Sequence, residues 1–324
     1  MNGRHSGRTW KDGERTVGTN DMRKNRFKVD DPHPLKPFSK LIINAALTGM
    51  VPTKKDTPYV PVAVEEIIED AVRCVSAGAS ILHLHARDEM EKPTYNSEVF
   101  AKIITGIRQH CPDVIICVTT SGRTYNEFEM RSEVLDLHGF AKPDMASLTL
   151  GSLNFPKQAS INDPGMIMKL AEKMNSKGIM AELEIFDAGM INMARYLHRT
   201  GYLIPPFYFN IILGSVYSTQ ARMSDLSYLV NLLPQDAIWA GGGIGLFQLA
   251  VNTAAIVMGG HVRTGIEDNI WYDYKRTELT TNEKSMQRIG RIGRELGRDI
   301  ATAAEARGML GLQMNSIPAQ AGVF

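Results

Sequence analysis

Two histidines lie two residues apart in an apolar run that continues into charged residues. The run is Ile81–Asp88, with the sequence ILHLHARD, and it contains His83 and His85. Successive side chains of a β-strand point to opposite faces, so a strand here would place both imidazoles on one face. Two neutral imidazoles side by side can bind a divalent ion, with a carboxylate or water completing the site. Two hydrogen-bonded core histidines would show the same spacing.

A second cluster combines two carboxylates and a guanidinium in His261–Asn269, with the sequence HVRTGIEDN. Burying this much charge is unfavourable unless a metal, an ion pair or a substrate compensates. Glu267 is the candidate third metal ligand, and Asp268, held ionised by Arg263, is a candidate general base. Glu184 is a candidate partner of Arg263. An exposed acidic loop and a purely structural Arg–Asp pair are the alternatives.

Hydroxyl groups and a guanidinium follow a third apolar run, in Val118–Arg123. Hydroxyls, exposed amides and a guanidinium together can hold a carboxylate or an oxyanion. An ordinary turn also uses Ser-Gly, so the segment alone has low specificity. The candidate substrate-binding residues from this region and the next apolar run are Thr119, Ser121, Gly122, Arg123 and Ser147.

The glycine-rich segment Gly241–Gly245 follows another apolar run and precedes a helical pattern. Free amides at a helix start favour anions, so Gly242, Gly243 and Gly245 are candidates for binding a phosphate or the pyrophosphate of a thioester cofactor. The alternative is that the glycines only permit tight packing. The segment is not GxGxxG and lacks an acidic ribose partner at the expected distance, which argues against a nicotinamide cofactor.

Short β-branched runs alternate with helical patterns from Leu41 onward, which is typical of a parallel sheet with crossover helices. Eight runs that each precede a helix favour a closed (β/α)₈ barrel over an open sheet. In such barrels the active site forms at the carboxyl ends of the strands, where the polar clusters above lie. The predicted strands are Leu41–Leu47, Ser80–Ala86, Val114–Thr120, Met145–Leu150, Met180–Phe186, Tyr208–Leu213, Ala237–Ala240 and His261–Gly265.

Helices are predicted between the strands from apolar residues at helical spacing and from capping residues. A further helix, Ala303–Leu312, is expected to pack against the outside of the barrel or against a partner. Residues 1–38 are polar and predict a separate N-terminal arm, either a partly flexible tail or a segment that covers a neighbouring subunit, leaving residues 39–324 as one barrel with C-terminal helices. The predicted helices of the barrel are Val64–Ala77, Ser97–Gln109, Asn126–Leu137, Asp163–Lys177, Gly189–Arg199, Ser224–Leu233, Leu246–Met258 and Lys284–Leu296.

The composition of the chain argues against several classes of partner and location. The 324 residues carry 36 basic and 35 acidic side chains, so no bulk field favours nucleic acid or a membrane surface. Three cysteines without CxxC spacing predict no disulfide framework and favour a reducing cytoplasm. The most apolar stretch, Ile238–Gly260, is interrupted by polar residues and predicts core rather than a membrane span. The arm and the last helix together favour a homo-oligomer, with a tetramer as the expected form.

With this combination of motifs, the sequence resembles the β-keto acid cleavage enzymes from about Leu41 to Leu312. Several separated motifs in order carry the resemblance. They are Gly78–Arg87 (GASILHLHAR), Phe186–Ile191 (FDAGMI), Met258–Asn269 (MGGHVRTGIEDN) and Glu295–Arg298 (ELGR).

The resemblance implies a zinc-dependent barrel with one zinc ion per chain, which converts a β-keto acid and acetyl-CoA into acetoacetate and a new acyl-CoA. His83, His85 and Glu267 match the zinc ligands of the family, and Asp268 with Arg263 matches the base. Zinc would act as a Lewis acid on the keto oxygen. Thr119 and Ser147 replace a serine and a threonine of some members and keep the hydroxyl groups.

The loop after the first predicted strand departs from part of this family. Members that act on an amino-bearing substrate have a glutamate there, whereas this chain has Val51. Valine does not pair with an ammonium group, so the predicted substrate tail is not a primary amine; it is apolar, or anionic and facing Arg123. A metal-dependent aldolase or acyl-CoA lyase barrel and a non-catalytic oligomeric binding barrel are the competing interpretations.

Overall fold

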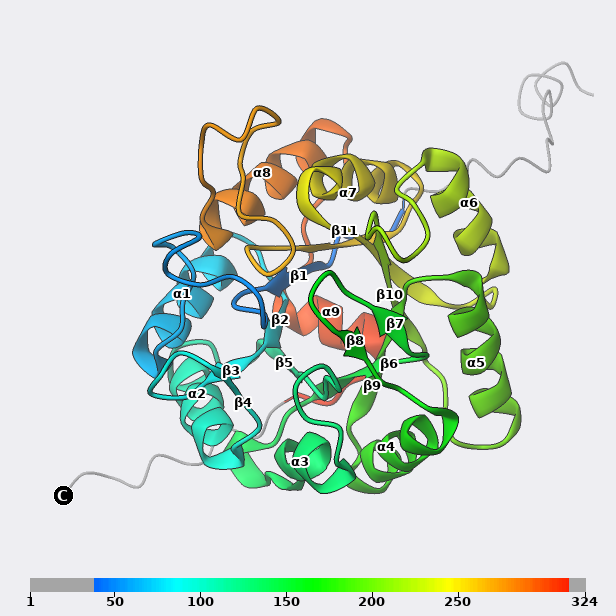
Figure 1. Ribbon diagram of the computed structural model, residues 1–324. Helices are drawn as coiled ribbons and strands as arrows, with labels where there is room; N and C mark the ends of the chain where they lie inside the picture. The colour runs from blue at the N-terminus through cyan, green and yellow to red at the C-terminus, as the bar shows by residue number, and fades with distance from the viewer. Residues whose placement is uncertain (1–37, 315–324) are drawn as a thin grey trace, which may run out of the picture. The chain divides into compact units, whose positions relative to one another are not determined.

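A computed structural model describes residues 38–314, which contain a closed barrel of eight parallel strands surrounded by helices (Figure 1). The strands pair in chain order, and the last closes onto the first through Ile43 opposite Val262. The predicted (β/α)₈ barrel is therefore confirmed. The barrel strands are β1 Ile43–Ala46, β2 Ile81–Leu84, β5 Ile115–Val118, β6 Met145–Thr149, β9 Met180–Ile185, β10 Tyr208–Leu213, β11 Ile238–Gly243 and β12 His261–Thr264.

The helices around the barrel lie where capping residues and apolar spacing predict them. Asp163 caps one of them by accepting hydrogen bonds from the amides of Gly165 and Met166, and Gly178 ends the same helix in the left-handed conformation. The segment predicted as a helix over Asn126–Leu137 is a short helix followed by a 3₁₀ turn. The surrounding helices are α1 Val64–Ser76, α2 Ser97–His110, α3 Phe128–Ser132, α4 Pro164–Lys177, α5 Ala188–Arg199, α6 Met223–Leu232, α7 Gln248–Val257 and α8 Asn282–Glu295.

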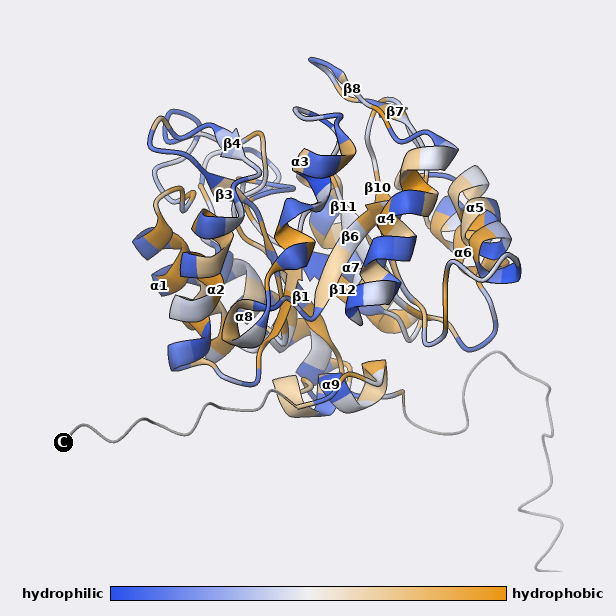
Figure 2. Cartoon of the chain, turned by 90° about the horizontal axis from the view of Figure 1, so that it is seen from below, coloured by the Kyte–Doolittle hydropathy of each residue, from blue (hydrophilic) through white to orange (hydrophobic). Residues whose placement is uncertain are grey.

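Two short hairpins and several loops stand at the carboxyl ends of the strands. One hairpin pairs β3 Ala86–Arg87 with β4 Pro93–Thr94, and the other pairs β7 Leu153–Asn154 with β8 Ala159–Ser160. Both follow directly after a barrel strand, and Figure 2 shows them at the same end of the barrel. This end is the mouth at which barrels of this class carry their active sites.

The glycine-rich segment departs from its predicted position. The seventh barrel strand extends to Gly243, so Gly242 and Gly243 pair with Ile212 and Leu213 within the sheet instead of opening a helix. A Cβ on Gly243 would lie 2.7 Å from backbone atoms of Phe247. The glycine therefore permits close packing of the following turn on the sheet, and only Gly245 lies in the turn itself.

The last helix, α9 Ala303–Leu310, corrects a second prediction. It does not pack on the outer ring of helices but covers the amino-terminal end of the barrel, opposite the mouth (Figures 1 and 2). Ala306 and Leu310 are buried there against Ile42 and Ile81 from inside the barrel. The side chain of Arg307 is buried beside them and donates to the carboxylate of Asp144. This helix closes the barrel floor.

Some predictions lie outside the described residues. The predicted N-terminal arm, residues 1–38, falls almost wholly in residues 1–37, which the structure does not describe. Within residues 38–314, no helix is both long enough and apolar enough to cross a membrane. The predicted tetramer and the predicted cytoplasmic location stay predictions.

Candidate metal centre and active site

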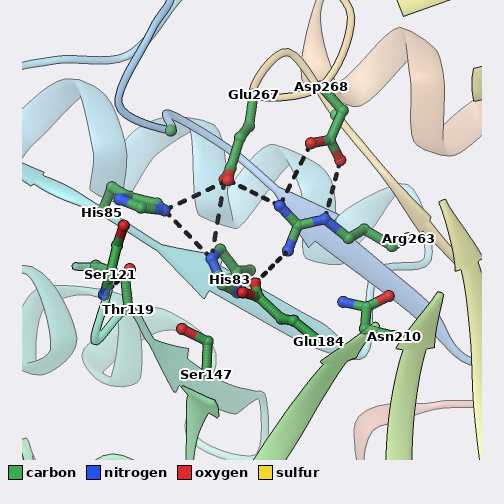
Figure 3. Close-up of polar contacts among 12 residues, drawn as sticks. His83, His85, Thr119, Ser121, Ser147, Glu184, Asn210, Arg263, Glu267 and Asp268 are labelled. Carbon is green, nitrogen blue, oxygen red and sulfur yellow. Dashed lines mark hydrogen bonds and ion pairs between the residues drawn. The ribbon is translucent and has the colours of Figure 1, made fainter. Parts of the chain in front are cut away.

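His83 and His85 point into the barrel at its mouth, as the two-residue spacing predicts (Figure 3). His83 belongs to β2, and His85 follows the end of that strand. Their Nε2 atoms are 3.3 Å apart. Glu267, from the turn after β12, places Oε1 3.4 Å from Nε2 of His85 and Oε2 3.9 Å from Nε2 of His83. Barrel closure therefore brings together the three residues proposed as metal ligands.

Glu267 is positioned by a turn that only certain residues allow. Gly265 has a φ of +154°, and a side chain there would collide with the backbone of Ala46 in β1. The next amide, of Ile266, donates to Oδ1 of Asn282 at 2.7 Å. Gly49 leaves room for the carboxylate chain, because a Cβ at this position would lie 2.5 Å from Cγ of Glu267.

The donor set fits a divalent metal ion. In a tetrahedral zinc site with bonds of about 2.0–2.1 Å, neighbouring ligand atoms are about 3.3–3.4 Å apart, close to the two shorter separations measured here. Oε2 of Glu267 is buried and has no hydrogen-bond partner among the described residues. Burial lowers the pKa of His85 to about 4, so its imidazole is neutral, which is the form that binds metals.

Glu182 supports the site from below and was not singled out from the sequence. Its Oε2 lies 2.8 Å from Nδ1 of His83, and its Oε1 accepts hydrogen bonds from Asn44 at 2.6 Å and Asn210 at 3.0 Å. Burial would raise the pKa of Glu182, but His83, Arg263 and the Cys117 thiol together outweigh this effect and lower it to about 2. The carboxylate therefore orients the imidazole and leaves Nε2 facing Glu267. Alternation in β9 was the available signal, since Glu182 and Glu184 share one face.

His83, Cys117 and Glu182 also lie within metal-ligand distance of one another. Both oxygens of Glu182 are already occupied, and the Cys117 thiol donates to this carboxylate at 3.3 Å. Burial and the nearby Glu182 raise the pKa of the thiol well above its usual range. A thiolate ligand is therefore disfavoured, and this group is a hydrogen-bonded layer beneath the candidate metal centre.

Arg263 connects the acidic residues on the opposite side of the mouth. Its Nε donates to Asp268 at 2.9 Å, another guanidinium nitrogen donates to Glu267 at 2.7 Å, and a third lies 3.8 Å from Glu184. Glu184 also accepts a hydrogen bond from Thr149 at 2.6 Å. The structure thus brings Arg263 together with Asp268 and Glu184, its two predicted partners, and also with Glu267.

The pKa of the Asp268 carboxyl is set by opposing effects of its surroundings. Arg263 does hydrogen-bond this carboxylate, as predicted, and favours its ionised form. Burial and the neighbouring Glu267 act in the opposite direction, and the pKa of Asp268 is raised. A carboxylate with a raised pKa has a stronger tendency to accept a proton, which suits a general base better than a fully stabilised ion pair would.

A cavity of about 670 Å³ opens above these residues. Thr119, Ser121 and Arg123 line it, together with Val51 and Gly245. The cavity also takes in aromatic residues that were not predicted, including Phe155 of the β7–β8 hairpin tip and Trp271 of the loop after β12. Those residues belong to irregular loops, for which no periodic pattern exists in the sequence.

The other predicted binding residues are not in the cavity wall. Ser147 is buried, and its hydroxyl accepts a hydrogen bond from the amide of Thr120. Gly122 packs against Arg131 and the carbonyl of Ile161, where a Cβ would lie 2.6 Å from either. Gly242 and Gly243 are also absent from the cavity wall. These residues shape the site through packing and hydrogen bonds behind the cavity wall.

Comparison with known proteins finds one matching family model and relatives that cover most of the chain. The family model for the beta-keto acid cleavage enzyme matches residues 40–312. The chain is 39% identical over 277 residues to the 3-keto-5-aminohexanoate cleavage enzyme of Fusobacterium nucleatum subsp. nucleatum, covering 85% of this chain and 99% of that protein. It is 37% identical over 274 residues to the 3-oxoadipate:acetyl-CoA acetyltransferase of Cupriavidus necator, covering 84% and 94% respectively.

A solved structure is similar in fold. The ternary complex of ObcA with a C4-CoA adduct and oxalate matches with a TM-score of 0.72 and 19% sequence identity, over 79% of this chain and 68% of that chain. At this level of identity, the similarity concerns the architecture alone.

Proposed function

This chain belongs to the beta-keto acid cleavage enzyme family, and on that premise we propose that it converts a β-keto acid and acetyl-CoA into acetoacetate and a new acyl-CoA. The names of relatives such as the 3-oxoadipate:acetyl-CoA acetyltransferase support acetyl-CoA as the co-substrate. The observation that carries the proposal is the cluster of His83, His85 and Glu267 at the barrel mouth, with His85, Glu267 and Asp268 lining one cavity there.

We propose zinc as the metal, with one ion per chain held by His83, His85 and Glu267. Two imidazoles and one carboxylate are a common donor set of catalytic zinc sites, which keep a further position open for substrate. When bound, the ion supplies Lewis acidity at the keto oxygen of the substrate and favours the enolate.

The side chains around the ion would transfer the proton and position the substrate. Asp268 accepts a proton from C2 of the β-keto acid, and Arg263 holds the carboxylate in place. The C2 carbanion attacks the thioester carbonyl of acetyl-CoA, so that a C–C bond forms and the CoA thiolate leaves. The thiolate then attacks the C3 keto carbon and the C2–C3 bond breaks, which releases acetoacetate, after protonation at C2, and the new acyl-CoA. The hydroxyls of Thr119 and Ser121 position the substrate at the cavity wall.

A coupled assay tests this function directly. Purified protein, assayed with acetyl-CoA over a panel of β-keto acids, should form acetoacetate and acyl-CoA in equal amounts, and metal analysis of the same sample should find zinc near one per chain. Cleavage that proceeds equally well without acetyl-CoA would instead indicate an aldolase or lyase.

Glu182 is expected to control metal affinity. Replacing it with glutamine removes the charge that orients His83 and should weaken zinc binding by about 10–100-fold. Competition with a chromogenic chelator measures this affinity without any substrate. Glu184→Gln is the matched control, because Glu184 lies on the same face of β9 but makes no hydrogen bond to His83. Equal zinc affinity in Glu182→Gln and wild-type protein would refute the role.

Val51 is expected to exclude amino-bearing substrates. Arg87 donates to the carbonyls of Gly49 and Pro52, which holds this loop over the cavity, and the Val51 side chain has no charge to pair with an ammonium group. We expect kcat/KM for 3-keto-5-aminohexanoate to lie about tenfold or more below that of the best acid in the panel. Val51→Glu should reduce this difference. The prediction is wrong if kcat/KM of the wild-type protein is highest for 3-keto-5-aminohexanoate.

A further inference from the structure

Arg123 occupies an unusual position in the cavity wall. Its guanidinium stacks on the ring of Phe155, with 3.5 Å between Cζ and the ring centroid. The backbone is held from two directions, since the Arg123 amide donates to the hydroxyl of Ser121 and its carbonyl accepts a hydrogen bond from Gln158. The loop after β5 and the β7–β8 hairpin therefore present this side chain to the cavity in one orientation.

The guanidinium of Arg123 has no anionic partner in the part of the chain that the structure describes. No hydrogen bond or ion pair joins it to an acceptor, and its Nε is buried without a partner. Other buried arginines differ, since Arg131, for example, donates to Thr120, Ile161 and Asn162. A partly buried cation without a counter-ion is unfavourable, and an anionic ligand would compensate it.

The carboxylates that share the cavity with Arg123 already have other partners. Glu267 and Asp268 accept hydrogen bonds from Arg263, and Glu184 accepts one from Thr149. These carboxylates act on Arg123 only through space, so an anion in direct contact with its guanidinium would come from a ligand. Planar guanidinium groups bind carboxylates through two parallel hydrogen bonds, so a carboxylate suits this site well.

Three anionic groups could meet Arg123: the carboxylate shared by all β-keto acids, a phosphate of CoA, or a carboxylate at the far end of the substrate. The shared carboxylate must stay close to the reacting C2 and C3 atoms at His83, His85 and Glu267. Arg123 lines the same cavity and lies within range of the charge of Glu267, but among the described residues no hydrogen bond or ion pair joins it to any of these three. The phosphates of CoA are expected to bind the exposed lysines and the exposed arginine at the rim of the cavity. These are Lys55, Lys157 and Arg276.

We propose that Arg123 determines specificity by pairing with a second carboxylate at the far end of the substrate, so that the preferred substrates are 3-oxo dicarboxylic acids. This inference rests on the proposed function and adds the chemical class of its substrate. Val51 contributes apolar wall to the same cavity for the methylene groups between the keto carbon and the second carboxylate.

Two six-carbon acids that differ only in the terminal group provide the test. 3-Oxoadipate carries the second carboxylate, and 3-oxohexanoate ends in a methyl group. We expect wild-type protein to prefer 3-oxoadipate, and Arg123→Gln to lower kcat/KM for 3-oxoadipate by about 100-fold while changing that for 3-oxohexanoate by less than about threefold. Arg123→Lys should retain part of the preference. Lys157→Gln removes an exposed cation of the same cavity and should leave the preference unchanged.

The outcomes separate this inference from the proposed function. An equal loss on both acids, or a loss expressed only as a higher KM for acetyl-CoA, would assign Arg123 to the shared carboxylate or to CoA and overturn the inference. A wild-type preference for 3-oxohexanoate would overturn it as well. If neither acid gives acetoacetate, the proposed function fails, and calorimetric titration with 3-oxoadipate still decides the inference: Arg123→Gln should bind it at least about tenfold more weakly than wild type.

Discussion

Replacement of His85 by alanine is expected to remove the bound metal and the acetoacetate-forming activity together. The variant deletes one of three donors, leaving His83 and Glu267 as a two-ligand site. Such a site should lose zinc on purification, and turnover should fall by a factor on the order of 1000, because the Lewis acid is lost. Metal analysis and the acetyl-CoA-dependent assay on one sample measure both effects.

His110→Ala is the control for this variant, because His110 is an exposed histidine at the end of α2, outside the barrel lumen. It should leave metal content and turnover unchanged. The assignment of His85 as a metal ligand would be wrong if the His85→Ala protein kept its zinc or turned over at the wild-type rate. A loss of turnover with zinc retained would place His85 in contact with substrate alone.

The histidine pair illustrates what local sequence can predict. The period of two in ILHLH determines that both imidazoles share a face once the segment is a strand, and eight strand–helix units determine that this face is the lumen. Glu267 is 182 residues further along the chain than His85, and barrel closure brings them together. Because β12 and β2 pair with opposite edges of β1, their carboxyl ends lie on either side of the end of β1.

The incorrect predictions concern segments whose position depends on tertiary contacts. A run of glycines carries no alternation of apolar and polar residues, so the pattern did not reveal that β11 continues to Gly243. Helix α9 has an apolar face that could cover the outside, a partner or the barrel floor, and the burial of Ala306 and Leu310 on the floor depends on the finished barrel. Both features follow from packing between segments distant in sequence.

In the candidate site, too, the sequence shows which residues could do chemistry, whereas tertiary contacts determine which of them face the cavity. Ser147 has the right chemistry and lies on a barrel strand, but its hydroxyl is used by the amide of Thr120 and does not reach the cavity. Glu182 was overlooked because a buried carboxylate is unfavourable in isolation, and its four hydrogen-bonding partners come from four other strands. The sequence identified residues whose side chains could take part in chemistry. The register of the strands determines which of them reach the cavity.

Asp268→Asn is expected to reduce kcat by about 1000-fold while leaving zinc bound, because general-base catalysis contributes about 10²–10⁴ in rate. The substitution keeps the size of the side chain and an oxygen that can accept a hydrogen bond from Arg263, but it removes the group that accepts the proton. Neither His83, His85 nor Glu267 is altered. Steady-state kinetics and metal analysis on the same sample separate the two effects.

The pair of variants distinguishes the two sides of the mouth. His85→Ala should lose zinc and turnover together, whereas Asp268→Asn should lose turnover alone and keep a KM for acetyl-CoA within about threefold of wild type, as expected when only the chemical step is affected. If Asp268→Asn retains kcat within about tenfold, Asp268 is a structural partner of Arg263, because loss of a true base costs more than this. Glu184, which also lies beside Arg263 and lines the cavity, would then be the carboxylate to test as the base.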